Sequence, residues 1–206
     1  MTVFPMMIPS AGKKCLVAGG GKVALHKIRI LLQAEFEVLV TAPEILPEIR
    51  ELPVKILQRK VRKTDLEGIF LAVDATGDRE TGIFMSNLCR ERNIPLNVVD
   101  CPGLCDFIFP AMLRKGKLTA AVSTAGASPI AAQWVRDQIE NLLPKAVPEI
   151  LEQMDAIRPE VRREIPNQKQ RAAYLKKCFA AAVERGRILT GEELKELWKN
   201  KQEAYV

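Results

Sequence analysis

Histidine and aromatic residues are scarce in this chain: its 206 residues include one histidine, and Phe, Trp and Tyr together make up 5%. With His26 alone, a two-histidine iron or cobalt site cannot form within one chain. The few aromatic rings offer no stacking platform for nucleic-acid bases. No apolar run approaches the roughly 20 residues that cross a membrane. We therefore predict no metal site, no nucleic-acid partner and no membrane partner.

A secretion signal is missing as well. Met1–Pro9 is apolar, but it lacks a cationic leader and contains two prolines, unlike a signal peptide. The five cysteines are an odd number scattered along the chain, which is typical of reduced thiols rather than disulfides. We therefore predict a cytoplasmic protein.

Positive charge is in modest excess, with a formal net charge of +6. It is concentrated in Lys55–Lys63, where five of nine residues are Lys or Arg. Such a run most often forms a solvated edge. The functional alternative is attraction of an anionic ligand, and a polyanionic small molecule fits the composition better than DNA does.

A run of three glycines follows an apolar segment, Cys15–Ala18, and precedes an amphipathic stretch. This G-x-G-x-x-A pattern predicts a strand, a phosphate-binding turn and a helix. Gly19 would make the tight turn, Gly21 would let the backbone approach a pyrophosphate, and Ala24 would pack the helix on the strand. The alternative is a plain glycine turn, because the pattern alone has low specificity.

Strands and helices are predicted to alternate over the first hundred residues. Apolar runs predict further strands at 37–42, 54–58, 69–75 and 96–99, with helices at 23–35 and 79–92. This order predicts a Rossmann-like, doubly wound parallel sheet of the α/β class. The turns at 19–22, 42–44, 76–78 and 100–103 would then line one crevice at the carboxyl ends of the strands.

The pattern changes after residue 106. Phe107–Leu113 and Leu118–Ser123 predict a β-hairpin, and Ser128-Pro129 begins a helix that runs to Leu143. Beyond Pro148 the chain is helical by pattern, with breaks expected at Pro159 and Pro166 and a last helix starting at Thr190. We predict an NAD-binding domain at 1–112, a dimerisation segment at 113–147 and a helical domain at 148–206. The alternative to a homodimer is a helical lid packed on its own sheet.

Several motifs resemble a known family. In order they are Phe4-Pro5, Val17–Ala24 with Lys27 and Leu31-Leu32, Thr41–Glu44, Ala75–Asp78, Asn97–Pro102, Phe107–Ala111 and Ala121–Pro129. The chain resembles precorrin-2 dehydrogenases, both the stand-alone members and the N-terminal module of siroheme synthase, from about residue 3 to residue 145. No methyltransferase module follows, so we expect the monofunctional or bifunctional form.

The resemblance implies an enzyme that oxidises precorrin-2 to sirohydrochlorin with NAD as hydride acceptor. Several members then insert ferrous iron as a second substrate. It also implies a strand-exchanged homodimer and a helical C-terminal domain. By resemblance and by the turn pattern, the predicted NAD-binding residues are Gly19, Gly20, Gly21, Lys22, Val23, Ala42, Pro43, Glu44 and Thr76.

Asp100 matches the family's key aspartate. Oxidation releases a hydride and a proton, and a carboxylate at the lip of the crevice can accept the proton. The same carboxylate could bind pyrrole N–H groups or guide iron. Without the resemblance, Asp before Cys-Pro is an ordinary turn former.

The tetrapyrrole substrate is expected to bind beside a small-residue segment after the hairpin. The predicted substrate-binding residues are Ser123, Thr124, Gly126 and Ser128. Free N–H groups at the following helix could hold a substrate carboxylate, although helix capping alone explains Gly126 and Ser128. Thr124 occupies the position of a phosphorylatable serine in the siroheme synthase module, and a phosphate there would repel the anionic substrate.

The second strand favours NAD over NADP. A typical NAD site has Asp or Glu at the end of this strand, whereas Thr41 is neutral and Glu44 comes slightly late. No arginine follows immediately to bind a 2′-phosphate. Two other functions use the same features: an NAD-sensing regulatory module, and a sirohydrochlorin chelatase that does not depend on NAD.

Overall fold

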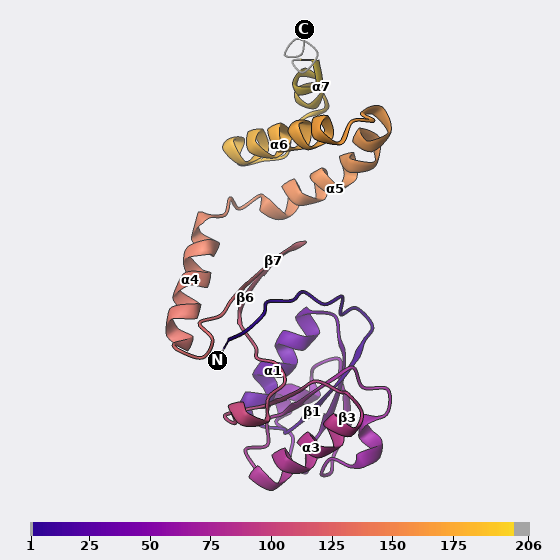
Figure 1. Cartoon of the computed structure of the whole chain (residues 1–206), viewed down its shortest axis with the longest axis vertical. Coiled ribbons are helices and arrows are strands. Elements are labelled where there is room, and N and C mark those ends of the chain that lie inside the picture. Colours follow the sequence, from indigo (N-terminus) through magenta and orange to yellow (C-terminus); the bar gives the residue numbers. More distant parts are fainter. Residues whose placement is uncertain (1, 200–206) are drawn as a thin grey trace. The chain divides into compact units, whose positions relative to one another are not determined.

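The computed structural model describes residues 2–199, and the chain forms two compact units. One comprises Phe4–Phe109, and the other comprises Pro110 and the residues after it, with the first residues of the chain. The first unit holds a five-stranded sheet, and the second holds a hairpin and the C-terminal helices (Figure 1). Within residues 2–199, no helix has the length and apolar character needed to cross a membrane.

Five parallel strands form the sheet of the first unit, in the order β3-β2-β1-β4-β5. The strands are β1 (Lys14–Ala18), β2 (Glu37–Thr41), β3 (Lys55–Leu57), β4 (Leu71–Asp74) and β5 (Leu96–Val98). They are connected by helices α1 (Lys22–Gln33), α2 (Pro47–Arg50) and α3 (Arg79–Glu91) and by the short 3-10 helices η1 (Lys63–Leu66) and η2 (Pro102–Leu104). The predicted Rossmann-like α/β sheet is confirmed.

Both faces of this sheet are covered, because successive side chains of each strand point to opposite sides. On one face Leu16 packs in a cluster with Met85 of α3, and on the other Val17 packs with Ile28 of α1. All four side chains are fully buried. The carboxyl ends of the strands are therefore the edge at which loops can form a ligand site.

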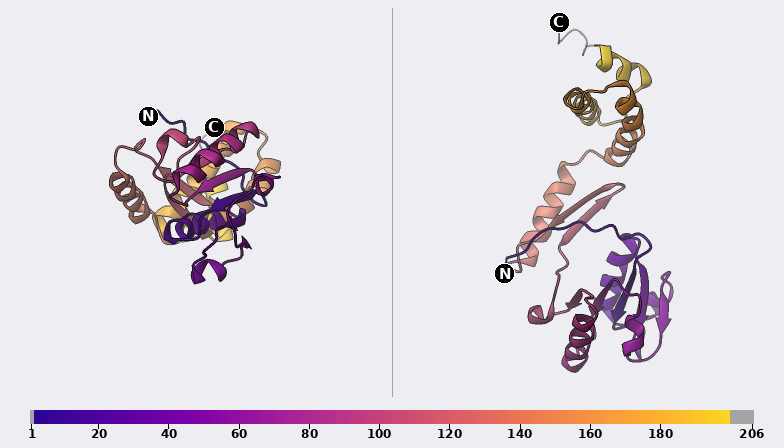
Figure 2. Two further views of the ribbon diagram at one scale, coloured as in Figure 1. Left: turned by 90° about the horizontal axis from the view of Figure 1, so that it is seen from below. Right: turned by 45° about the vertical axis from the view of Figure 1, so that its right-hand side comes forward.

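The second unit contains the antiparallel hairpin of β6 (Ala111–Lys115) and β7 (Leu118–Val122), joined at Gly116, which has φ +56°. Helix α4 (Pro129–Leu142) packs along both strands (Figure 2). Helices α5 (Val147–Glu164), α6 (Gln168–Arg185) and α7 (Gly191–Lys199) follow. Their buried apolar side chains, from Ile150 to Leu189, form a cluster of their own.

Two predicted boundaries were wrong. Helix α5 runs through Pro159 without a break. Pro159 and Asp155, whose carbonyl loses its amide partner, are exposed, so water can replace the missing donor. The first hairpin strand begins at Ala111 rather than Phe107. The carbonyl of Phe107 instead accepts a hydrogen bond from Asn97 Nδ2 at 2.9 Å, which holds this segment against β5.

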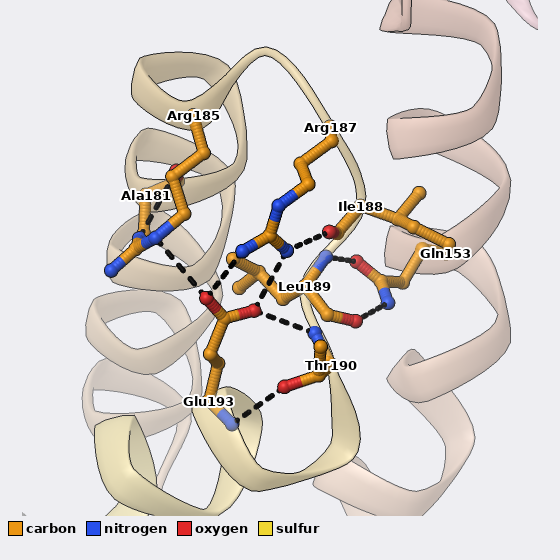
Figure 3. Close-up of polar contacts among 8 residues, drawn as sticks. All are labelled: Gln153, Ala181, Arg185, Arg187, Ile188, Leu189, Thr190 and Glu193. Atoms are coloured by element: carbon orange, nitrogen blue, oxygen red, sulfur yellow. Dashed lines mark hydrogen bonds and ion pairs between the residues drawn. The ribbon is translucent and has the colours of Figure 1, made fainter.

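Glu193 joins the loop after α6 to the start of α7 (Figure 3). Its carboxylate accepts hydrogen bonds from both terminal nitrogens of Arg187, at 2.8 and 2.9 Å, and from the backbone N–H of Thr190 at 2.7 Å. The Glu193 amide donates in turn to Thr190 Oγ1 at 3.2 Å, which completes a capping box. Gln153 of α5 bonds both backbone groups of Leu189, so the same loop is tied to α5.

Glu193→Gln is expected to destabilise the protein at neutral pH but not in strong acid. The Arg187 hydrogen bonds, followed by the Thr190 amide, lower the pKa of Glu193 to about 2. A lowered folded-state pKa gives stability that is complete above the ordinary carboxyl pKa and is lost as the pH falls toward 2. In thermal melts, the gap between native protein and variant should close over that range. Glu192→Gln, a change at the exposed neighbour, is the control and should show no such gap.

Candidate active site

The glycine turn after β1 lies against two other loops. Gly19 has φ +123°, and a Cβ on it would lie 2.5 Å from the Ala75 carbonyl oxygen. A Cβ on Gly20 would lie 2.0 Å from the carbonyl oxygen of Glu44. Leu46 also donates its N–H to the carbonyl of Gly20 at 3.0 Å. The turns after β1, β2 and β4 therefore converge, and glycine is needed where their backbones touch.

Gly21 is different, because nothing lies within 4 Å of the position its Cβ would occupy. It is the N-cap of α1, and no side chain caps this helix, whereas Asp78, Ser128 and Asn167 cap α3, α4 and α6. The first amides of α1, including those of Lys22 and Val23, thus start a helix in open space. An uncapped helix start beside a residue without a side chain fits a pyrophosphate.

The turn after β2 contains the other predicted nucleotide residues. Ala42 is buried, while Pro43 and Glu44 are exposed. Thr41 ends the strand; it is buried, and its hydroxyl has no hydrogen-bond partner among the described residues. The backbone of Glu44 touches Gly20, so this contact places an acidic residue next to the glycine turn.

A cavity of about 460 Å³ opens between the end of β4, the start of α3 and the end of β5, and we call it the β4–α3–β5 cavity. It is lined by Val23, Asp74, Ala75, Thr76, Gly77, Asp78, Arg79, Gly82, Val98, Val99, Asp100, Cys101 and Leu104. The structure therefore places Val23 and Thr76, both predicted to bind NAD, around the same cavity as Asp100.

Asp100 is exposed and follows β5 in a tight turn, in which Cys101 donates its N–H to the Val98 carbonyl at 3.2 Å. Its φ is +60°, in the left-handed region that few residues other than Gly, Asn and Asp adopt readily. The backbone conformation alone therefore favours Gly, Asn or Asp at position 100, whatever the role of the side-chain carboxylate.

Lys27 is a residue of the site whose place the sequence prediction missed. It is half-buried on α1, and its Nζ lies 4.2 Å from the centre of the Phe109 ring. Burial lowers the pKa of Lys27, while the charges of Asp100 and Cys105 oppose this shift. The sequence does contain a signal for this position. Lys27 lies three residues after Ala24 and one before Ile28, which are both fully buried, so the helical spacing places Lys27 beside the buried face of α1.

The predicted substrate-binding residues lie in the second compact unit. Thr124 Oγ1 donates to the Ser128 carbonyl and accepts from the Ser128 N–H, both at 3.0 Å. Ser128 Oγ accepts from Ala131 N at 3.1 Å, and Ser123 Oγ accepts from Ala125 N at 3.1 Å. Gly126 has φ +89°. These hydroxyl groups hold the loop and cap α4, so a role with substrate stays a prediction.

The predicted alternative of an anionic-ligand site along Lys55–Lys63 is weakened by one internal pair. Arg59 donates two hydrogen bonds of 2.7 Å to Asp65, which is largely buried. These bonds lower the pKa of the Asp65 carboxyl.

No group of three or more His, Cys, Asp or Glu side chains within residues 2–199 is arranged to hold a metal ion.

Two protein-family models match the chain. One, described as "Putative NAD(P)-binding", covers residues 6–111, and the other, "Sirohaem biosynthesis protein central", covers residues 115–142. The solved structure of SirC, precorrin-2 dehydrogenase, matches with a TM-score of 0.74 at 21% identity, over 98% of this chain and all of that one. This likeness supports the fold.

Curated relatives match over most of this chain. The siroheme synthase of Thioalkalivibrio sulfidiphilus is 35% identical over 187 residues, which are 89% of this chain and 38% of the relative. The siroheme synthase of Ectopseudomonas mendocina is 35% identical over 202 residues, 95% of this chain and 44% of the relative. The chain thus spans about two fifths of the length of these relatives. The predicted relationship to siroheme-synthesis proteins is confirmed: the chain belongs to the putative NAD(P)-binding family, and its segment 115–142 matches the sirohaem biosynthesis central family.

Proposed function

We propose that the protein oxidises precorrin-2 to sirohydrochlorin with NAD. The observation that carries this proposal is the β4–α3–β5 cavity, in which Asp100 lies beside two residues of the nucleotide turns, Val23 and Thr76. The names of the siroheme synthases and of SirC supply the substrate class. NAD rather than NADP is favoured because Glu44 is the charged side chain at the turn after β2.

The chain's own groups have three tasks in this reaction. NAD, when bound, supplies the hydride acceptor. The amides of Lys22 and Val23 at the start of α1 hold its pyrophosphate, because Gly21 leaves the approach open. Asp100 accepts the proton that substrate oxidation releases. Lys27 is the cation on α1 whose pKa the charge of Asp100 raises, against the opposite effect of burial.

The test is anaerobic incubation of the purified protein with NAD and precorrin-2. NADH and the absorption spectrum of sirohydrochlorin should appear together. Binding of NAD without turnover would instead indicate a sensing module, and metal insertion into sirohydrochlorin without NAD would indicate a chelatase. Ferrous iron as a second substrate stays a prediction, tested by adding Fe²⁺ to the product.

Ser123, Thr124, Gly126 and Ser128 are retained as proposed substrate contacts through the backbone at the start of α4. The division at 1–112, 113–147 and 148–206 is likewise a proposal, supported by the separate cluster of α5–α7. A cytoplasmic location also stays a prediction, and all five cysteines are free thiols.

A homodimer through the second unit is part of the proposal. Ile130 and Trp134, one turn apart on α4, are 79% and 62% exposed. The β6–β7 sheet has only two strands, and an isolated two-stranded sheet is marginally stable. A second copy would cover the apolar side chains and could extend the sheet.

Trp134→Glu is therefore expected to turn the dimer into a monomer, because a carboxylate would have to lose its water at the interface. The measurement is molar mass by light scattering during size exclusion. Gln133→Glu adds the same charge at an exposed polar neighbour and should leave the mass at that of a dimer. A native protein that elutes as a monomer would contradict the proposal.

A further inference from the structure

Asp74 is the buried member of the three carboxylates that line the β4–α3–β5 cavity. It ends β4 and is 2% exposed, whereas Asp78 and Asp100 are exposed. Its Oδ1 accepts hydrogen bonds from the N–H of Thr76 at 3.0 Å and from Thr76 Oγ1 at 2.7 Å. Its other oxygen, Oδ2, has no hydrogen-bond donor within residues 2–199.

The space beside this second oxygen exists because α3 has a glycine there. A Cβ on Gly82 would lie 3.2 Å from Asp74 Oδ2 and 3.3 Å from Val98 Cγ1. Any larger residue would therefore crowd this part of the cavity. Asp74 thus combines a fixed orientation, set by Thr76, with one oxygen that is free to meet a ligand.

The environment of Asp74 favours a positively charged ligand. Burial raises the pKa of Asp74, the Thr76 hydrogen bonds oppose this rise, and the charge of Asp78 adds to it. The Thr76 hydrogen bonds therefore offset only part of the free-energy cost of removing the carboxylate from water. Among the described lining residues Arg79 is the one cation, and it is exposed at the start of α3.

The strand order indicates which end of the dinucleotide lies here. The residue after the second strand of such a fold contacts the adenosine ribose, and the first turn holds the pyrophosphate. In the order β3-β2-β1-β4-β5, β2 lies on one side of β1 and β4 and β5 on the other. The nicotinamide end therefore extends toward β4 and β5, where the β4–α3–β5 cavity lies. The oxidised ring carries a positive charge that the reduced ring lacks.

We propose that Asp74 selects the oxidised dinucleotide, with its carboxylate facing the cationic nicotinamide and contributing little to binding of the neutral reduced form. This inference rests on the proposed function. It makes the site bind the oxidised cofactor in preference to the reduced product, which limits inhibition by NADH.

The test compares dissociation constants for NAD⁺ and NADH, measured by calorimetry on native protein and on Asp74→Asn. The variant keeps an oxygen for the Thr76 donors and loses the charge. Its affinity ratio should shift about tenfold toward NADH, as expected for one lost charge at short range in a partly desolvated site. Glu80→Gln removes a charge from the exposed first turn of α3, away from the cavity lining, and should shift the ratio less than about twofold.

Asp74→Ala, measured in parallel, removes the charge without burying an amide and should shift the ratio in the same direction. Thr76→Val keeps the carboxylate but loosens the loop, so it should weaken both forms equally. An unchanged ratio in the two Asp74 variants would overturn the inference and leave the proposed function intact. Failure of the native protein to bind either dinucleotide would overturn both.

Discussion

Asp100→Asn is expected to lower the rate of precorrin-2 oxidation by roughly 10²–10⁴-fold, the usual contribution of a general base, while leaving the fold and NAD binding in place. The amide cannot accept the proton that leaves the substrate, but it has nearly the shape of the carboxylate. Asn also tolerates the left-handed backbone that this position requires, with φ +60°. The measurements are NADH formation at saturating substrate and NAD affinity by calorimetry.

The backbone of Asp100 determines which control is informative. Asp100→Ala would lose the carboxylate and also strain the turn, by about 1–2 kcal/mol for a residue forced into the left-handed region. Asp100→Gly loses the carboxylate but fits the same φ without strain. If the Asn and Gly variants are both stable and both inactive, the loss of activity comes from the missing carboxylate and not from strain in the turn. Turnover at the native rate in either variant would exclude Asp100 as the proton acceptor.

The sheet was predictable because its signals are local. Each of the five parallel strands lies in an apolar run, and the helix start at Lys22 follows directly from the glycines. The interior of α5 was not predictable in this way. Whether Pro159 breaks a helix depends on whether water reaches the unpaired carbonyl, and this depends on which face of α5 is buried.

The predicted turns were correct as positions, but the reasons for individual residues were tertiary. The G-x-G-x-x-A pattern leaves its second position free, yet Gly20 is required there because the Glu44 backbone, 24 residues later in the chain, touches it. Asp74 has the sequence of an ordinary strand end, and only its burial beside Gly82 distinguishes it from Asp78. Contacts between loops that are distant in sequence carry no local pattern.

Two adjacent substitutions in the glycine turn are expected to affect different properties, one the stability of the protein and the other its affinity for NAD. Gly20→Ala should destabilise the first unit by about 1–3 kcal/mol, the usual cost of overpacking, because its Cβ would lie 2.0 Å from a backbone oxygen that cannot rotate away. A thermal melt measures this loss as a lower Tm. Weakened NAD binding in this variant would carry no information, since the turn itself is disturbed.

Gly21→Ala should leave Tm nearly unchanged and lower NAD affinity at least tenfold, or about 1.4 kcal/mol. Its backbone, at φ −92° and ψ −170°, is open to alanine, and the new methyl group meets no protein atom within 4 Å. The cost of alanine at an N-cap is below about 1 kcal/mol. The methyl group would instead occupy the approach to the amides of Lys22 and Val23. If this variant melts and binds NAD as the native protein does, the pyrophosphate does not lie at the start of α1, and the site must be sought elsewhere along the carboxyl edge of the sheet.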